Sequence, residues 1–289
     1  MQRLLIRFIM SCSSVLFALM ISACIVNTGF AATNTRLQPT SPSASVIKYN
    51  SHWSGYVLGS GSGNGFKSVQ GSWNTQCTGS AAPASASQQV STWVGLGGYY
   101  GLGLVQTGTE IDDAGNYHLF LEVINANGVD QIKQYVPNAS ATGFGCGQHI
   151  QAVVYYHPAG CSGGFTTSIV NSSNNTSLAS GCIFSNSDIQ SAEWIDERPY
   201  CQTDFATLAD FNWTGWSNVL AQANYSGAAW VNPNAYYNIN IIMAVGHTPS
   251  TMAATDGNSV NSDNTFTDRW YNSGPATTGS CGYHTQCLC

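Results

Sequence analysis

The sequence predicts an all-β protein, built as a two-sheet antiparallel β-sandwich. From His52 onward, short runs rich in Val, Ile, Thr and aromatic residues alternate with clusters of turn residues. No alternation of strands with helices accompanies them, which argues against a parallel sheet covered by helices. The chain of 289 residues is 43 % hydrophobic and only 8 % charged, so it has material for a large core under a polar but mostly neutral surface.

The predicted strands follow one another along most of the chain. Turn sequences such as GSGSGNG, DDAGN, NANG and NSSNN separate them. The segment Asp204–Phe211 is the place where a helix could form. The runs predicted to be strands lie at residues 53–58, 67–73, 91–97, 103–110, 117–124, 149–156, 165–170, 191–197, 236–245 and 266–271.

The charge balance excludes one class of partner. Eight Lys and Arg residues face fourteen Asp and Glu residues, which gives a net charge of −6. This sign is wrong for binding a nucleic-acid backbone, so we expect no nucleic-acid partner.

Residues 1–31 have the pattern of an export signal. Arg3 and Arg7 precede an uncharged apolar stretch, and Gly29-Phe30-Ala31 supplies the small residues of a cleavage site. A retained membrane anchor and a lipid anchor at Cys24, within the lipobox-like Ile21-Ser22-Ala23-Cys24, are the alternatives. We expect no membrane span and a secreted protein, with a periplasmic or lipid-anchored location as the alternative. Residues 32–47, rich in Ser, Thr and Pro, are a predicted flexible leader, linker or propeptide.

Eight cysteines follow the predicted signal. An even number in an exported chain predicts four disulfides, whose pairing the sequence leaves open. No CxxC pair recurs and no HExxH motif occurs, so we expect no metal and no other cofactor. The predicted sandwich domain spans residues 48–272, and residues 273–289 form a Cys-rich tail. We expect a monomer.

Two catalytic motifs are present only in part. Gly160-Cys161-Ser162-Gly163-Gly164 matches GxSxG, but a strand and not a helix follows it, so a disulfide-pinned hairpin is expected instead of a nucleophile elbow. Glu110-Ile111-Asp112 begins like the ExDxxE signature of glucanases, but Gly115 stands in place of the third acid.

Five blocks, taken in order, carry a family resemblance. They resemble the glutamic peptidases, also called eqolisins or peptidase family G1, and especially their bacterial-type members. The similarity extends from about residue 50 to residue 271. The blocks are His52–Val57 (HWSGYV), Trp93–Gly98 (WVGLGG), Gln106–Glu110 (QTGTE), Leu121–Val123 (LEV) and Ala192–Pro199 (AEWIDERP).

The resemblance implies a concanavalin A-like, jelly-roll sandwich with the active site on its concave face. It assigns catalysis to Gln106 and Glu193, and it implies a secreted acid endopeptidase that acts on protein or peptide substrates. The same resemblance places Trp53 and Trp93 in the substrate cleft. It places Glu110 and Glu122 around the catalytic pair, as groups that bind substrate or hold the water network. This chain departs from the family pattern at Gly97, where an acid is usual, and at Leu121, where an aromatic residue is usual.

The residues themselves agree with these roles. An extended strand would put Gln106 and Glu110 on one face, and Glu193 on one face with Ile195 and Glu197. Burial among apolar groups would raise the pKa of Glu193. As a carboxylate, Glu193 would take a proton from the attacking water and later give it to the leaving amine, while Gln106 would stabilise the oxyanion.

Next to Glu193 in the sequence, we expect Asp196 and Glu197 to be solvated charges at a strand end.

A second function is also possible for this fold. The alternative is a non-catalytic or carbohydrate-binding sandwich that uses Trp53, Trp93 and Trp194 as stacking platforms.

Overall fold

The computed structural model describes residues 46–60, 63–78, 88–101, 103–136, 144–201, 204–245, 250–257 and 259–275. The predicted export signal, Cys24, nearly all of the leader and most of the tail lie outside these residues. No helix among the described residues is long and apolar enough to cross a membrane. Their one helical element is the single 3₁₀ turn Pro233–Ala235.

The described strands pack as two layers. The first layer has the order β7-β6-β5-β4-β11-β2-β17-β1, and its pairs are antiparallel except for the parallel pair of β1 and β17. Its strands are β1 (Val46–Asn50), β2 (Trp53–Gly59), β4 (Gln88–Gly97), β5 (Leu104–Ile111), β6 (Tyr117–Ile124), β7 (Asp130–Val136), β11 (Ser191–Glu197) and β17 (Tyr237–Val245).

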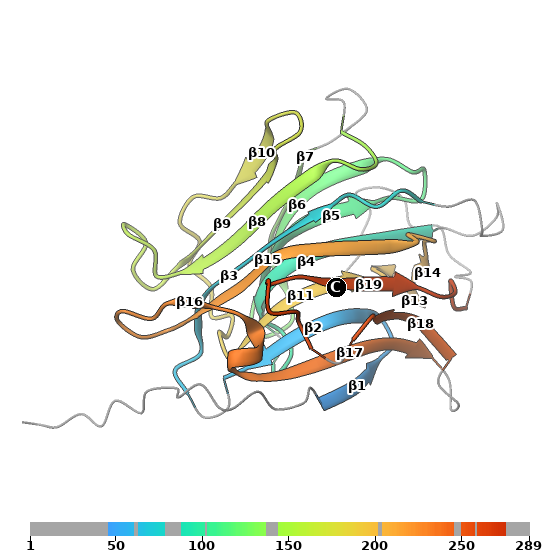
Figure 1. Cartoon of the computed structure of the whole chain (residues 1–289). Helices are drawn as coiled ribbons and strands as arrows, with labels where there is room; N and C mark the ends of the chain where they lie inside the picture. Colours follow the sequence, from blue (N-terminus) through green and yellow to red (C-terminus); the bar gives the residue numbers. More distant parts are fainter. Residues whose placement is uncertain are drawn as a thin grey trace, which may run out of the picture. The chain divides into compact units, whose positions relative to one another are not determined.

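The second layer has the order β10-β9-β8-β3-β15-β19 and is antiparallel throughout (Figure 1). Strand β18 (Ser250–Thr255) pairs with both β17 and β19 and so joins the layers into one continuous sheet. The strands of this layer are β3 (Phe66–Asn74), β8 (His149–Tyr156), β9 (Phe165–Asn171), β10 (Thr176–Ala179), β15 (Trp213–Ala223) and β19 (Phe266–Trp270).

The main core fills the space between the two layers. Alternate residues of each strand point into it, as the period of two in an extended chain requires. The first layer contributes Tyr56, Leu58, Val94, Leu96 and Trp194, and the second contributes Val69, Trp73, Ile150, Phe165 and Trp216. The two-sheet antiparallel β-sandwich predicted from the sequence is therefore confirmed.

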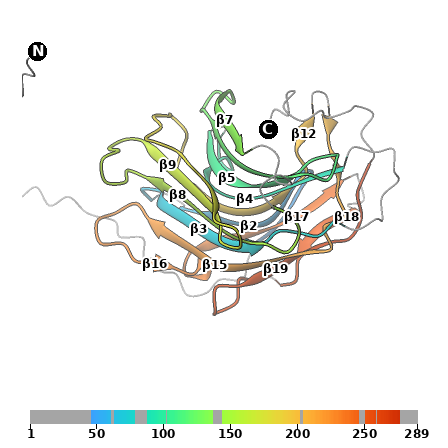
Figure 2. The same ribbon diagram turned by 90° about the horizontal axis from the view of Figure 1, so that it is seen from above.

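The opposite face of the first layer carries a second apolar cluster, centred on Trp53, Trp93 and Ile195. Figure 2 shows that this layer is bent, with β4, β5, β2 and β17 along the inside of the curve. We call this face, which points away from the core between the two layers, the outer face of the first layer.

The prediction of a helix at Asp204–Phe211 is wrong. The segment forms the short strands β13 (Asp204–Phe205), which pairs with β12 (Tyr200–Cys201), and β14 (Thr207–Leu208), which extends the sheet beside β4. The remaining short strand, β16 (Trp230–Val231), pairs with β15.

Two disulfides lie in the described part of the chain. Cys77 pairs with Cys146, and Cys161 pairs with Cys182. Gly160 and Gly163 have φ angles of 83° and 81° in the turn between β8 and β9, which L side chains rarely adopt. The GxSxG segment is therefore a disulfide-pinned hairpin, as predicted. The side chains of the other four cysteines that follow the predicted signal lie outside the described residues.

Candidate active site

One cross-strand row on the outer face brings the two predicted catalytic residues together. Glu193 on β11 pairs with Gly95 on β4, Gly95 pairs with Gln106 on β5, and the row continues through Glu122 on β6 to Lys133 on β7. Neighbouring strands lie about 4.8 Å apart, so the Glu193 and Gln106 backbones are separated by about 10 Å. Gly95 places no side chain of its own between them.

The Gln106 amide is held in one orientation. Its Nε2 donates to Glu122 Oε2 at 2.7 Å, and Lys133 Nζ lies 3.0 Å from Glu122 Oε1. A carboxylate can only accept hydrogen bonds, so the amide nitrogen must face Glu122. This leaves the second N–H of Gln106 and its buried Oε1, which has no hydrogen-bond partner among the described residues, for other contacts.

Glu193 is completely buried. Burial raises the pKa of Glu193 well above its usual value, and the charge of Asp188 raises it further. The Ser191 hydroxyl partly opposes the rise in this pKa, although neither Glu193 oxygen has an aligned hydrogen-bond partner among the described residues. Such a carboxyl exchanges protons at a higher pH than an exposed glutamate, which suits proton transfer to and from water.

The remaining acids of this face are also buried. Glu110 accepts a hydrogen bond from the Tyr135 hydroxyl at 3.1 Å, and burial raises the pKa of Glu110. Glu197 accepts from Trp93 Nε1 at 2.7 Å, and burial raises the pKa of Glu197 to about 8. Even so, no group of three or more His, Cys, Asp or Glu side chains within the described part is arranged to hold a metal ion.

The prediction that Asp196 and Glu197 are solvated strand-end charges is wrong. Glu197 is 4 % exposed on the outer face, and Asp196 is 0 % exposed between the layers. Asp196 accepts hydrogen bonds from Thr92 at 2.5 Å and Thr214 at 3.1 Å. Every residue of β11 is buried, on both of its faces, so a polar residue in this strand is not exposed merely because it is polar.

Trp53 and Trp93 form the apolar floor beside the row. Their rings meet edge to face with centroids 5.2 Å apart. The Trp93 ring and Leu104 Cδ1 lie over Gly95, where an added Cβ would be 2.8 Å and 2.9 Å from them. Trp53, Trp93 and Trp194 are 8 %, 0 % and 0 % exposed, so the idea that all three act as stacking platforms is wrong for this structure, and Trp194 belongs to the core between the layers.

Strand β7 and two of its side chains, which contact acids of the candidate site, were not predicted from the sequence. Lys133 and Tyr135 stand two residues apart on one face of this strand and contact Glu122 and Glu110. The Lys-x-Tyr spacing was a usable signal, because residues i and i+2 of a strand share a face.

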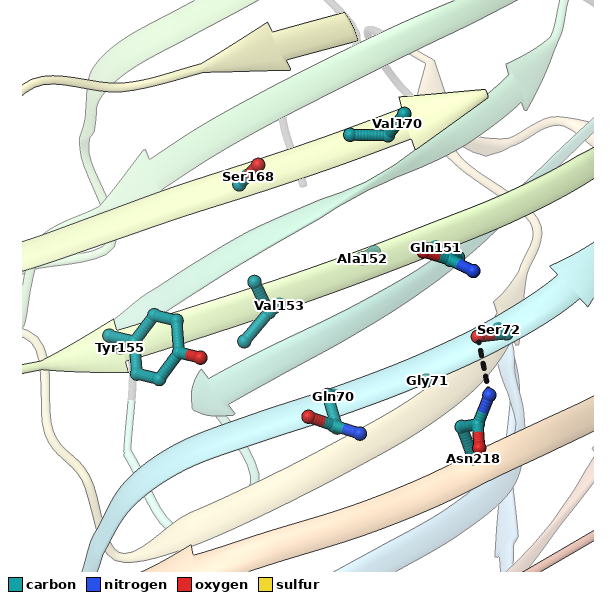
Figure 3. A pocket seen from close by; sticks show the side chains of 10 residues that line it. All are labelled: Gln70, Gly71, Ser72, Gln151, Ala152, Val153, Tyr155, Ser168, Val170 and Asn218. Atoms are coloured by element: carbon teal, nitrogen blue, oxygen red, sulfur yellow. Dashed lines mark hydrogen bonds between the residues drawn. The ribbon is translucent and has the colours of Figure 1, made fainter. Parts of the chain in front are cut away.

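Two hollows in the described part lie away from this row. One, of about 370 Å³, lies over β15, β3, β8 and β9 on the side of the second layer that faces away from the core (Figure 3). Its lining is neutral and comprises Gln70, Gly71, Ser72, Gln151, Ala152, Val153, Tyr155, Ser168, Val170 and Asn218. A smaller one, of about 190 Å³, lies beside Gln76 and Trp213.

Comparisons with known proteins identify the family of this chain. A family model described as the Peptidase A4 family matches residues 51–264. The chain therefore belongs to this family, the glutamic peptidases or eqolisins, and is a glutamic endopeptidase. A comparison with curated proteins gives no match.

Solved structures show the same fold. The chain is similar to scytalido-glutamic peptidase, solved with a peptide-based transition state analog, with a TM-score of 0.59 and 16 % identity over 77 % of this chain and 99 % of that one. It is also similar to SCP-B, an eqolisin solved in a complex with the tripeptide Ala-Ile-His, with a TM-score of 0.56 and 16 % identity over the same shares of the two chains.

Proposed function

We propose that this peptidase is a secreted, acid-active enzyme in which Glu193 activates water and Gln106 stabilises the oxyanion. The observation that carries the proposal is the shared row of Glu193, Gly95 and Gln106 on the outer face. It puts a proton-exchanging carboxyl and an amide donor on opposite sides of a residue that has no side chain.

The reaction proceeds without a covalent intermediate. The Glu193 carboxylate takes a proton from water as the water oxygen attacks the scissile carbonyl carbon. Glu193 then gives this proton to the leaving amine. The free N–H of Gln106 donates to the developing oxyanion, and Gln106 Oε1 can accept a hydrogen bond from the water. Glu122 and Lys133 keep the amide in this orientation.

A peptide substrate is expected to lie along this face. Trp53 and Trp93 form the packed floor that shapes the substrate cleft from below, and Trp53 is the more exposed of the two. Glu110 and Glu122 contact the substrate or hold the polar network around it. The relatives solved with a peptide-based analog and with a tripeptide support peptide binding here.

We also propose that the protein acts outside the cell as a monomer. The disulfides Cys77–Cys146 and Cys161–Cys182 support an oxidising compartment. Residues 1–31 would be the export signal, the following residues a leader or propeptide, and 273–289 a tail. The peptidase domain would begin at Val46 and not at residue 48, because β1 starts there and pairs with β17. A lipid on Cys24, detectable by mass spectrometry of the mature N-terminus, would change this location to a membrane surface.

Proteolysis measured across pH tests the proposed function. The purified mature protein should cleave acid-denatured protein, and the rate should rise with pH on the acidic side as Glu193 ionises. Failure to cleave peptide bonds at any pH between about 2 and 7, by protein with native circular dichroism, would overturn the proposal.

Replacing Gln106 should slow catalysis and leave the fold intact. Removal of one oxyanion donor typically lowers kcat by about 10²- to 10³-fold, so we expect a loss of this size in Gln106→Ala. Gln151→Ala is the matched control, because Gln151 is an exposed amide on the second layer and should keep wild-type kcat. Equal activity of the two variants in a peptide assay would rule out the role of Gln106.

A further inference from the structure

We propose that Asp188 is a positioning residue for Glu193, and that its negative charge makes Glu193 a stronger base. Asp188 lies in the segment before β11 and belongs to none of the five family-like blocks. The inference rests on the proposed role of Glu193 and names a residue that tunes it.

Three glycines make room for Asp188 and its neighbour Ser187. A Cβ on Gly97 would lie 2.6 Å from the Asp188 carbonyl oxygen and 3.1 Å from its Oδ1, and a Cβ on Gly101 would lie 2.7 Å from its Oδ2. A Cβ on Gly103 would lie 2.6 Å from Ser187 Cα. The turn after β4 therefore accommodates the Asp188 carboxyl between Gly97 and Gly101.

The carboxyl is held beside the catalytic row. The Gln190 backbone N–H donates to Asp188 Oδ1 at 2.9 Å. Gly97 follows Gly95 by two residues on β4, and Gly95 pairs with Glu193. Two residues along a strand span about 6.7 Å, so the Asp188 carboxyl lies roughly one row away from Glu193.

The other groups around Glu193 do not supply the same charge. Burial raises the pKa of the Tyr100 phenol, so it carries no charge in acid, and Ser191 and Gln106 are uncharged. The acid at the far end of the row, Glu122, is paired with Lys133. Glu197 lies four residues after Glu193 on the same face of β11 and accepts a hydrogen bond from Trp93. Burial raises the pKa of Glu197 to about 8, so Glu197 is neutral in acid.

Asp188 has no ion-pair partner among the described residues and is half-buried, so its charge is only partly screened. Burial raises the pKa of Asp188 as well, but the pKa of the fully buried Glu193 is raised further above its usual value, so Asp188 loses its proton first. Its charge also contributes to the raised pKa of Glu193. A carboxylate at this place favours the protonated form of Glu193, which is the form produced when the water gives up its proton.

The test compares kcat/KM across pH for wild type and Asp188→Asn. At low pH, kcat/KM rises with pH as Glu193 ionises, and we call this rise the acidic limb. In Asp188→Asn we expect its midpoint to shift to lower pH by about one unit, as two charges about 7 Å apart would cause. On that limb kcat/KM should therefore rise up to about tenfold. Asp113→Asn is the control, since it removes the same charge from an exposed turn and should leave the limb in place.

A second variant changes the position of the carboxyl but keeps its charge. Gly101→Ala pushes on Asp188 Oδ2 and should move the limb although no charge is removed. A limb that stays in place in Asp188→Asn and Gly101→Ala, or a uniform loss of rate at every pH, would overturn the proposal.

Titration of Glu193 by ¹³C NMR separates this inference from the proposed function. The midpoint should fall in Asp188→Asn whether or not the protein cleaves peptides. An unchanged midpoint overturns the role of Asp188, whereas a shifted midpoint in a protein without peptidase activity overturns only the role of Glu193.

Discussion

Glu193→Gln should lower kcat by about 10³-fold or more, because the variant has neither a general base nor a general acid. The same carboxyl serves both proton transfers, so no other group takes over one half of the reaction. Gln is nearly isosteric with Glu and fills the same buried position, and we expect KM to change little. Initial rates on a fluorogenic peptide at several pH values measure the loss.

The folded state of this variant provides the control. Glu193 is buried without an aligned partner, so replacing it should leave the circular dichroism unchanged and should not lower the melting temperature at neutral pH. Activity within tenfold of wild type would contradict the assignment of Glu193 as the base.

Raising the pH from 4 to 7.5 should lower the free energy of unfolding by several kcal/mol. Burial raises the pKa of Asp196 to about 6 and that of Asp268 well above its usual value, where the charge of Asp196 adds to the effect of burial. In an unfolded chain both would ionise near pH 4. Burial likewise raises the pKa of Glu197 to about 8.

The direction of the effect follows from proton binding. Above about pH 4 the unfolded chain has released protons that the folded protein still holds, so stability falls as pH rises towards the folded-state pKa values. Each pH unit in this interval costs about 1.4 kcal/mol per group, which is about 3 kcal/mol for Asp196 alone. The protein should therefore be most stable in acid.

Urea unfolding at the two pH values measures this change. Asp268→Asn should flatten the pH dependence and stabilise the protein at pH 7.5, because it removes one charge from the buried pair. Asp113→Asn, an exposed acid, should behave as wild type. Equal or greater wild-type stability at pH 7.5 than at pH 4 would show that these acids are not buried in a protonated form.

The central strands of the first layer were predictable from their runs of apolar and β-branched residues, whereas its edge strands β1 and β7 were missed. The segments 117–124 and 191–197 were predicted with the bounds that β6 and β11 have. The long strand β15 was missed, although it pairs with both β3 and β19. A bulge near Asn218, whose φ is 51°, shifts the buried positions from Thr214 and Trp216 to Val219 and Ala221, which hides the alternation.

Faces shared within one strand of the candidate site were predictable from the residues, whereas contacts between strands were not. The shared face of Gln106 and Glu110 follows from the period of two within β5. The contacts of Glu122 with Gln106 and Lys133 depend on register between strands, which the sequence does not specify. Asp188 depends on a turn that folds over β4, and no local pattern marks it.

Single-turnover hydrolysis of a peptide in ¹⁸O-labelled water, with enzyme in excess, tests the central claim most directly. Attack by water activated by Glu193 predicts cleavage with ¹⁸O in the new carboxyl group of every product and none in the Glu193 peptide. Product that lacks ¹⁸O together with a labelled Glu193 would show a covalent acyl intermediate, and absence of cleavage would show that this row does not hydrolyse peptides. Either result would contradict the account.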